Sequence, residues 1–163
     1  MDNLELIEGK LYSIEKLIPV LNVWRFLGER IVFTNGCFDL LHLGHIDYLA
    51  KAGDMGTKLV IGLNSDASTK NLKGPNRPIT DQNSRARLLA SLFFVDAVVL
   101  FDEETPYNLI SAVKPDVLVK GADYTIDKIA GADVVLANGG EVKTVTYLDG
   151  YSTTAIEQKI KNG

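Results

Sequence analysis

The chain has 163 residues, 46% of them hydrophobic, so it is long enough to bury one core and too short for two large domains. Its 17 basic and 21 acidic residues give a formal charge of −4, which argues against diffuse binding to nucleic acid or to a membrane surface. The single cysteine, the absence of a signal-peptide pattern and the absence of a long apolar run predict a cytoplasmic protein. An anionic ligand therefore needs a local cluster of positive groups.

Short runs of β-branched and aliphatic residues alternate with helical patterns along the chain. The expected strands are 31–33, 59–61, 97–100, 117–119 and 142–148. The expected helices are 46–55, 81–94, 106–113, a short one from about 130, and 152–160. This alternation predicts an α/β fold: a Rossmann-like, doubly wound, mainly parallel five-stranded sheet with helices on both faces.

Two further segments have to be placed around this sheet. Residues 1–30 carry apolar residues near helical spacing, and we expect an N-terminal helical extension that serves as a packing arm or a dimer element, ahead of a main domain over 31–163. Residues 64–80 are expected to form one long irregular loop, of the kind that is usually functional or mobile. Loops at the carboxyl ends of parallel strands are where doubly wound sheets bind ligands.

The turn after the first expected strand, TNGCFDLLHLGH, contains both histidines of the chain. A glycine-bearing turn that leads into a helix presents backbone N–H groups to an anion. His42 and His45 are three residues apart, so both rings lie on one face, and Gly44 between them leaves room for a phosphate. A helix cap beside a packed surface residue, or a metal-binding pair, are the alternatives; no cysteine or carboxylate stands at metal-motif spacing. We interpret the pair as phosphate-binding.

The segment TNGCFDLLHLGHIDYL resembles the signature of the cytidylyltransferase-like nucleotidyltransferase superfamily, whose hallmark is the HxGH motif. The resemblance implies that 31–163 is a nucleotidyltransferase domain, in which His42 and His45 are catalytic and stabilise charge at the α-phosphorus of a nucleoside triphosphate. It also implies a nucleotide-binding turn around these histidines. The implied residues are Thr34, Asn35, Gly36, Cys37, Phe38, Asp39 and Gly44.

Basic residues gather in and after the 64–80 segment, where five positive charges oppose one aspartate. They are Lys70, Lys73, Arg77, Arg85 and Arg87, against Asp81. Solvated surface charge is the alternative for any single one. We favour Lys73 and Arg77 over Arg85 and Arg87, which are two residues apart and point to different faces. Lys73 is also expected to act in catalysis. The expected substrate-binding residues are Asn64, Asp66, Lys73 and Arg77.

Two motifs complete the expected site, VKGADY after the fourth strand and GYSTTA before the last helix. Turn chemistry explains the first without a ligand, and ordinary helix capping explains the second. Hydroxyl and free N–H groups at a helix start also hold phosphate, and the superfamily has a similar STT segment that contacts the nucleotide. The expected nucleotide-binding residues are Lys120, Gly121, Asp123, Ser152, Thr153 and Thr154.

Within the superfamily, residues 32–160 are most similar to the D-glycero-β-D-manno-heptose 1-phosphate adenylyltransferases, through LNSDASTKNLKG with RPI, VKGADYTIDKIAGADVVLANGGEV and LDGYSTTAI in the same order. The resemblance implies AMP transfer from ATP to heptose 1-phosphate, giving ADP-heptose for lipopolysaccharide and pyrophosphate. Mg²⁺ would be held mainly by the nucleotide phosphates and not by residues of the chain. A homodimer is implied, and so are a separate heptose kinase and a phosphatase, because 163 residues leave no room for a kinase.

Other functions remain open from the residues. A cytidylyltransferase that uses CTP and glycerol 3-phosphate, or another alcohol phosphate, shares the HxGH and STT segments, but it usually has an arginine and a threonine where this chain has Tyr147, Leu148 and Asp149. A non-catalytic nucleotide-binding regulatory module would not need both histidines and the basic segment. A Rossmann-type dehydrogenase would need a GxGxxG after the first strand, and that pattern is absent.

Overall fold

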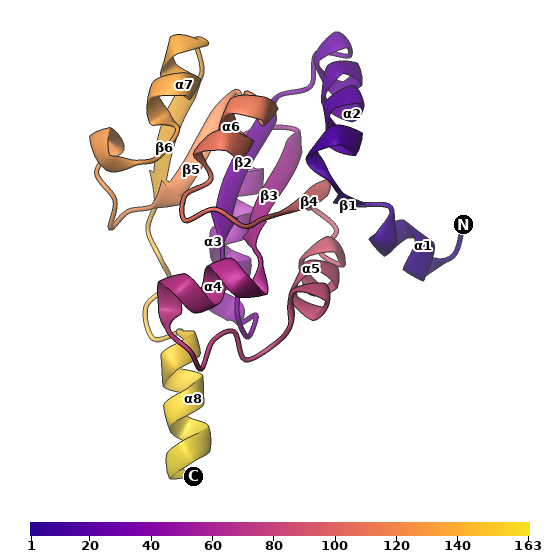
Figure 1. The fold of residues 1–163 in the computed structure, drawn as a ribbon. Helices are drawn as coiled ribbons and strands as arrows, with labels where there is room; N and C mark the ends of the chain where they lie inside the picture. Colours follow the sequence, from indigo (N-terminus) through magenta and orange to yellow (C-terminus); the bar gives the residue numbers. More distant parts are fainter.

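The computed structural model describes residues 1–163, and a six-stranded sheet forms its centre (Figure 1). All neighbouring strands are parallel, in the order β1-β4-β3-β2-β5-β6. The strands are β1 (Leu11–Tyr12), β2 (Ile31–Gly36), β3 (Lys58–Asn64), β4 (Ala97–Phe101), β5 (Val117–Gly121) and β6 (Glu141–Val145). The predicted Rossmann-like α/β fold is confirmed, with six strands instead of five.

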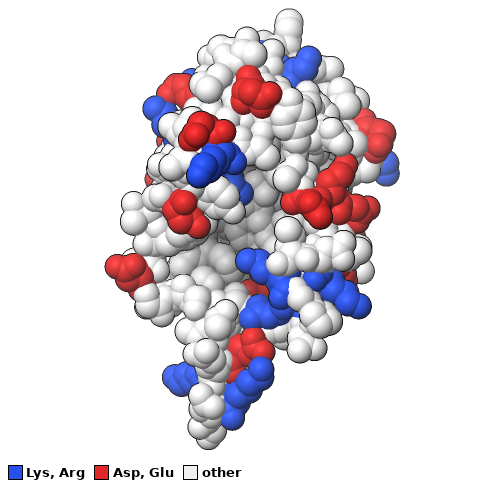
Figure 2. Space-filling model, turned by 60° about the vertical axis from the view of Figure 1, so that its left-hand side comes forward, with Lys and Arg blue, Asp and Glu red and all other residues white.

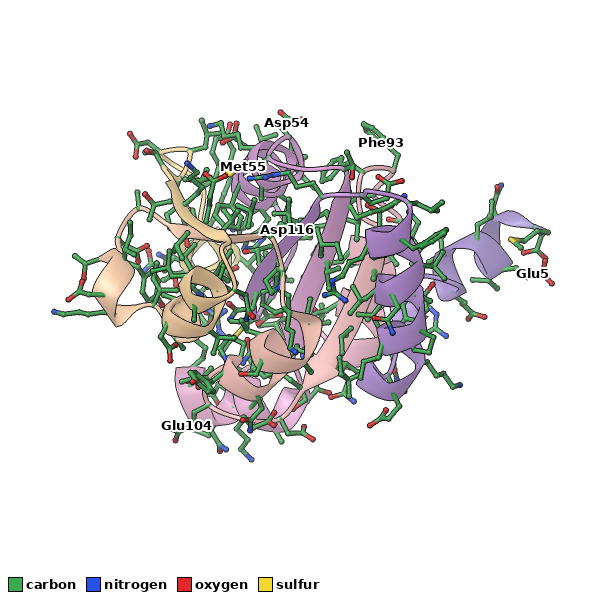
Figure 3. All side chains as sticks on the ribbon, turned by 90° about the horizontal axis from the view of Figure 1, so that it is seen from above. Glu5, Asp54, Met55, Phe93, Glu104 and Asp116 are labelled. Carbon is green, nitrogen blue, oxygen red and sulfur yellow. The ribbon has the colours of Figure 1, made fainter.

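Helices pack on both faces of the sheet. They are α1 (Asn3–Glu8), α2 (Ile14–Phe26), α3 (Leu43–Gly53), α4 (Asp66–Lys73), α5 (Gln82–Ala90), α6 (Tyr107–Val113), α7 (Ala132–Ala137) and α8 (Thr153–Asn162), with a 3-10 turn η1 (Ile126–Lys128). One face is covered by α2, α6 and α7, and the other by α3 and α5. Viewed from above, Asp54 and Phe93 lie on one side of the sheet and Glu104 on the other (Figure 3). None of the helices has the length and apolar character needed to cross a bilayer.

The sixth strand lies within residues 1–30, which we expected to be helical throughout. β1 pairs Leu11 with Val98 and Tyr12 with Val99 at the edge of the sheet. A two-residue strand shows no alternation pattern, so its sequence gives no signal. Residues 1–30 also contribute to the core, because α2 buries Leu17 against the same sheet face as α6. The segment is thus packed on the main body.

Residues 64–80 do not form one irregular loop, and that expectation is wrong. Ser65 caps α4 by accepting a hydrogen bond from the Ser68 backbone, and Gly74 ends the helix with φ +106°. The irregular part is confined to 74–81. The helix sequence DASTKNLK contains only two apolar residues, Ala67 and Leu72, so it lacks the repeated apolar positions that usually indicate a helix. The capping serine and the terminal glycine were the signals that the sequence did contain.

The strands position the site because their carboxyl ends lie at the same edge of the sheet. Val32 and Phe33 of β2 are both fully buried, in the apolar clusters on opposite faces of the sheet. Burial on both faces explains why these strands read as continuous apolar runs. Because the sheet is parallel, the segments that follow its strands lie at one edge, from which α8 projects (Figure 1).

Candidate active site

A cleft of about 930 Å³ opens at the carboxyl edge of the sheet. Figure 2 shows a hollow in the surface with an uncharged floor and basic groups on two sides. Most of the residues expected from sequence line this cleft. They are Asn35, Gly36, Cys37, Phe38, Asp39, His42, Gly44, His45, Asn64, Lys73, Arg77, Lys120, Ser152, Thr153 and Thr154. They converge from the ends of β2, β3 and β5 and from the segments that follow β2, β3 and β6.

The two histidines lie at the start of α3 and line the cleft together. Their rings are stacked, with centroids 3.7 Å apart and 20° between the planes. The His42 backbone N–H donates to His45 Nδ1 at 3.4 Å, so neutral His45 carries its ring proton on Nε2. A Cβ on Gly44 would lie 3.0 Å from the His42 ring and 3.1 Å from Tyr151. A larger residue would therefore crowd the space between α3 and the start of α8.

Both imidazoles are mainly neutral at pH 7. Burial, with a smaller contribution from His42, lowers the pKa of His45 to about 4, against a weaker opposing effect of Asp39. Burial also lowers the pKa of His42. His42 Nδ1 is buried without a hydrogen-bond partner. A phosphate beside these rings would favour their protonated forms, so the pair can match its charge to an anion that enters the cleft.

Arg85, which we ranked below Arg77, joins the segments that form the site through hydrogen bonds from its guanidinium. It is 1% exposed, and its Nη1 donates to Cys37 O at 2.7 Å and to Asn64 O at 2.8 Å, at the ends of β2 and β3. Nη2 pairs with Asp66 at 2.7 Å, and Nε donates to Thr80 O at 3.0 Å. The sequence shows the positive charge of Arg85 but not its four partners, which come from three separate stretches of the chain.

Arg87 points the other way, as its spacing from Arg85 predicts. It forms an exposed ion pair with Glu8 of α1, and its side chain is 45% exposed. The two arginines therefore lie on different faces of α5, one inside the protein and one at its surface.

Asp39 anchors the 74–81 segment with its side chain. The carboxylate accepts hydrogen bonds from Ile79 N at 2.7 Å and from Thr80 N and Oγ1 at 3.1 and 3.2 Å. Burial of Asp39 opposes its ionisation, but these bonds and the nearby Arg77 outweigh burial and lower its pKa. Arg77 Nη1 lies 3.4 Å from Asp39 and its Nη2 lies 2.6 Å from Glu157. Arg77 reaches the cleft with its charge already compensated by two carboxylates.

Lysines supply the uncompensated positive charge. Lys73, at the end of α4, lines the cleft and makes no ion pair. From β5, Lys120 donates to Asn35 Oδ1 at 3.1 Å, and its Nζ lies 4.8 Å from the centroid of the Tyr124 ring. Burial lowers the pKa of Lys120, with Asp123 opposing this shift. Tyr124 and Lys128 also line the cleft, and we had not singled them out.

The structure places four of the expected residues outside the cleft lining: Thr34, Asp66, Gly121 and Asp123. Thr34 is buried, with its hydroxyl 2.7 Å from Tyr48 OH. Asp66 pairs with Arg85. A Cβ on Gly121 would overlap the Tyr147 ring, so this glycine serves close packing. Asp123 is exposed in the turn after β5. These four residues therefore stabilise the structure around the site or lie at the surface.

The start of α8 combines capping with a position at the cleft. Ser152 Oγ accepts from the Ala155 backbone at 3.0 Å, and Thr153 Oγ1 donates to Asp39 O. Both hydroxyls are engaged within the protein, and Ser152, Thr153 and Thr154 still line the cleft. The two interpretations of this segment, a helix cap and a wall of the site, are therefore compatible.

The cleft contains few acidic groups that could bind a metal ion directly. Asp39 is committed to the 74–81 segment, and Glu104 and Asp149 are the remaining carboxylates in the lining. No three His, Cys, Asp or Glu side chains come together as a metal site. This donor set fits a Mg²⁺ ion whose main ligands are phosphate oxygens.

Comparison with known proteins gives the family. Residues 33–159 match the cytidylyltransferase-like family. The chain is 50% identical over 96% of its length to the bifunctional protein HldE of Geotalea uraniireducens, and 54% identical over 94% to that of Campylobacter fetus. It spans about a third of the length of these relatives, 32% in each case.

Solved structures agree with the fold. The lipopolysaccharide core biosynthesis protein of Thermoplasma volcanium matches 77% of this chain and 100% of its own, with a TM-score of 0.60 and 34% identity. Pantoate-beta-alanine ligase of Francisella tularensis matches 93% of this chain and 76% of its own, with a TM-score of 0.60 and 17% identity, which is a likeness of fold alone. With the HxGH pair and the cleft at the carboxyl edge, these matches establish that the chain belongs to the cytidylyltransferase-like family.

Proposed function

We propose that this chain is an adenylyltransferase that transfers AMP from ATP to D-glycero-β-D-manno-heptose 1-phosphate, giving ADP-heptose and pyrophosphate. The stacked pair His42 and His45, at the start of α3 in the cleft, is the observation that carries the transfer chemistry. The identity of about 50% with the HldE proteins and the match to a lipopolysaccharide core biosynthesis protein support the choice of sugar.

In the proposed reaction, a phosphate oxygen of the sugar attacks the α-phosphorus of ATP. One phosphorus–oxygen bond forms and the bond to the β-phosphate breaks, so pyrophosphate leaves with its electron pair. The nucleophile is already anionic at pH 7 and needs no general base. The chain must instead hold two anions together and stabilise the charge that develops at the transferred group.

The cleft residues divide this task between them. His42, His45 and the free N–H groups at the start of α3 donate to oxygens of the reacting phosphates. Lys73 on one wall and Lys120 on the other contribute positive charge that no carboxylate compensates directly. Bound to the triphosphate, Mg²⁺ would neutralise part of its charge. We assign Glu104 and Asp149 as the carboxylates available to its water shell.

The proposal extends to the surroundings of the enzyme. Heptose 1-phosphate has to be supplied by a sugar kinase and a phosphatase. We further propose a homodimer in the cytoplasm. Exposed apolar side chains of Val23, Phe26 and Leu27 at the end of α2 support a subunit contact.

A substrate panel tests the proposed reaction. Pyrophosphate release is measured with ATP or CTP, each combined with heptose 1-phosphate or with glycerol 3-phosphate, in the presence of Mg²⁺. We expect release with ATP and heptose 1-phosphate, and ADP-heptose as the second product. Release with CTP and glycerol 3-phosphate alone would replace this proposal by the cytidylyltransferase. Nucleotide binding without turnover under all four conditions would favour a regulatory module.

A further inference from the structure

Helix α8 projects from the body of the protein and has no buried residue (Figure 1). Ile160, in its last turn, is 73% exposed. Ile156 is only partly buried and no side chain of α8 belongs to either core cluster, so hydrophobic packing contributes little to the direction of this helix. Its first turn nevertheless forms part of the cleft wall, through Thr153 and Thr154. Some other interaction has to place this wall.

Two polar side-chain interactions join α8 to the rest of the chain, and both lead to Asp39, one directly and one through Arg77. Thr153 Oγ1 donates to Asp39 O, and Glu157 Oε2 lies 2.6 Å from Arg77 Nη2. Arg77 in turn lies 3.4 Å from the Asp39 carboxylate and is 16% exposed. Asp39 is fixed by its hydrogen bonds to Ile79 and Thr80. The site of attachment is therefore rigid, although the attached helix is exposed.

Glu157 is well suited to hold the helix in one position. Its second oxygen, Oε1, accepts from Lys161 one turn further along α8 at 2.7 Å, so both carboxylate oxygens have partners. The hydrogen bonds from Lys161 and Arg77 lower the pKa of Glu157, which keeps it charged at neutral pH. A charge-assisted bond to a guanidinium fixes direction as well as distance.

We propose that Glu157 is a positioning residue for the nucleotide: through Arg77 it holds the 152–154 turn of α8 against the cleft, where that turn meets the triphosphate. The inference rests on the proposed function, because it takes a nucleoside triphosphate as the ligand. It also reassigns Arg77, from direct contact with the sugar phosphate to attachment of α8. Without Glu157, one side-chain bond from Thr153 remains, and ligand binding has to order the turn at an entropic cost.

The test compares Glu157→Gln with the wild-type full-length chain. The amide keeps the size of the side chain and removes the charge that pairs with Arg77. We expect the dissociation constant for Mg-ATP, measured by calorimetry, to rise about three- to tenfold. KM for ATP should rise similarly with kcat little changed, because the lost interaction acts on binding. Hydrogen exchange of 153–162 should become faster in the free variant, and saturating Mg-ATP should slow it.

Two matched controls separate positioning from general loss of charge. Glu141, on β6, pairs with Arg30 and with Lys143, so it has two cationic partners as Glu157 does, but it lies outside the cleft lining. Glu141→Gln should therefore leave Mg-ATP binding unchanged. Lys161→Ala removes the second partner of Glu157 and keeps Arg77, so it should have less than half the effect on a logarithmic scale. Thermal unfolding should differ little among the variants, since α8 contributes no buried side chain.

The outcomes distinguish this inference from the proposed function. If the wild-type chain binds Mg-ATP while Glu157→Gln binds it equally well with unchanged exchange in α8, the positioning role is wrong. Tighter binding by the variant would also overturn it, because Glu157 would then compete with phosphate for Arg77. If the wild-type chain does not bind Mg-ATP, the proposed function itself fails.

Discussion

Two segments of the cleft wall, the turn between β2 and α3 and the start of α8, differ in how they are attached to the protein. The turn between β2 and α3 is built into the protein: Phe38 is buried, and Arg85 bonds the backbone of Cys37. Its backbone takes the left-handed region at Phe38 (φ 48°) and Leu40 (φ 51°), which residues with large side chains rarely adopt. The start of α8 is attached from outside by polar contacts. In the proposed reaction, the groups beside the transferred phosphate are thus preorganised, while the 152–154 wall depends on an exposed helix.

The largest effect should come from breaking the built-in segment at Arg85. Arg85→Met would leave Asp66 and the carbonyls of Cys37, Asn64 and Thr80 without their partner. We expect the free energy of unfolding in urea to fall by about 3–5 kcal/mol, mainly because three carbonyls lose their donor, since the Asp66 side chain is 41% exposed and can be solvated.

Arg87 provides the matched control for Arg85 on the same helix. Arg87→Met removes only the exposed pair with Glu8 and should change the free energy of unfolding by less than about 0.5 kcal/mol. Equal destabilisation by the two substitutions would contradict the difference between the two faces of α5.

Substitution of the histidines should remove turnover and leave the fold intact. For His45→Gln and His42→Gln we expect kcat to fall by about 10²–10³-fold, since each removes a donor to developing charge. The dissociation constant for Mg-ATP should change much less, and circular dichroism should be unchanged. Turnover at the wild-type rate in either variant would refute a catalytic role for that imidazole.

The partly buried His45 also makes the free energy of unfolding depend on pH. The pKa of His45 is about 4 in the folded protein, below its usual value of 6.5, so the unfolded chain binds a proton first as pH falls. The stabilisation is fully present above about pH 6.5 and is lost down to about pH 4, by up to about 3 kcal/mol. Urea denaturation at several pH values should show this slope, and His45→Gln should reduce it. An equal slope in the variant would assign the effect to other groups.

Removal of the attached helix should affect stability far less than Arg85→Met does. Removal of 151–163 deletes α8, which buries no side chain, so the free energy of unfolding should fall by less than about 1 kcal/mol. Mg-ATP binding should weaken strongly because the 152–154 wall is gone. A loss of stability comparable with that of Arg85→Met would show that α8 belongs to the core.

The parts of the structure that sequence predicted share a physical cause. Strands buried on both faces read as apolar runs, and a parallel sheet brings the segments after them to one edge, so the location of His42, Lys120 and Thr153 could be predicted. We missed β1 because two residues are too few to show alternation, and α4 because it contains only two apolar residues. The roles of Arg77 and Arg85 could not be separated, because a sequence shows a charge but not which distant carboxylate or carbonyl neutralises it.

A crystal structure with Mg²⁺ and an ATP analogue that cannot be cleaved at the α-phosphorus tests the central claim most directly. We expect the triphosphate in the cleft at the carboxyl edge of the sheet, with oxygens of the α-phosphate or its neighbours within hydrogen-bonding distance of His42 and His45. The 152–154 turn should contact the phosphates, and the bond between Arg77 and Glu157 should remain. A nucleotide bound elsewhere, or one whose phosphates do not contact either imidazole, would contradict the claim that this cleft catalyses nucleotidyl transfer.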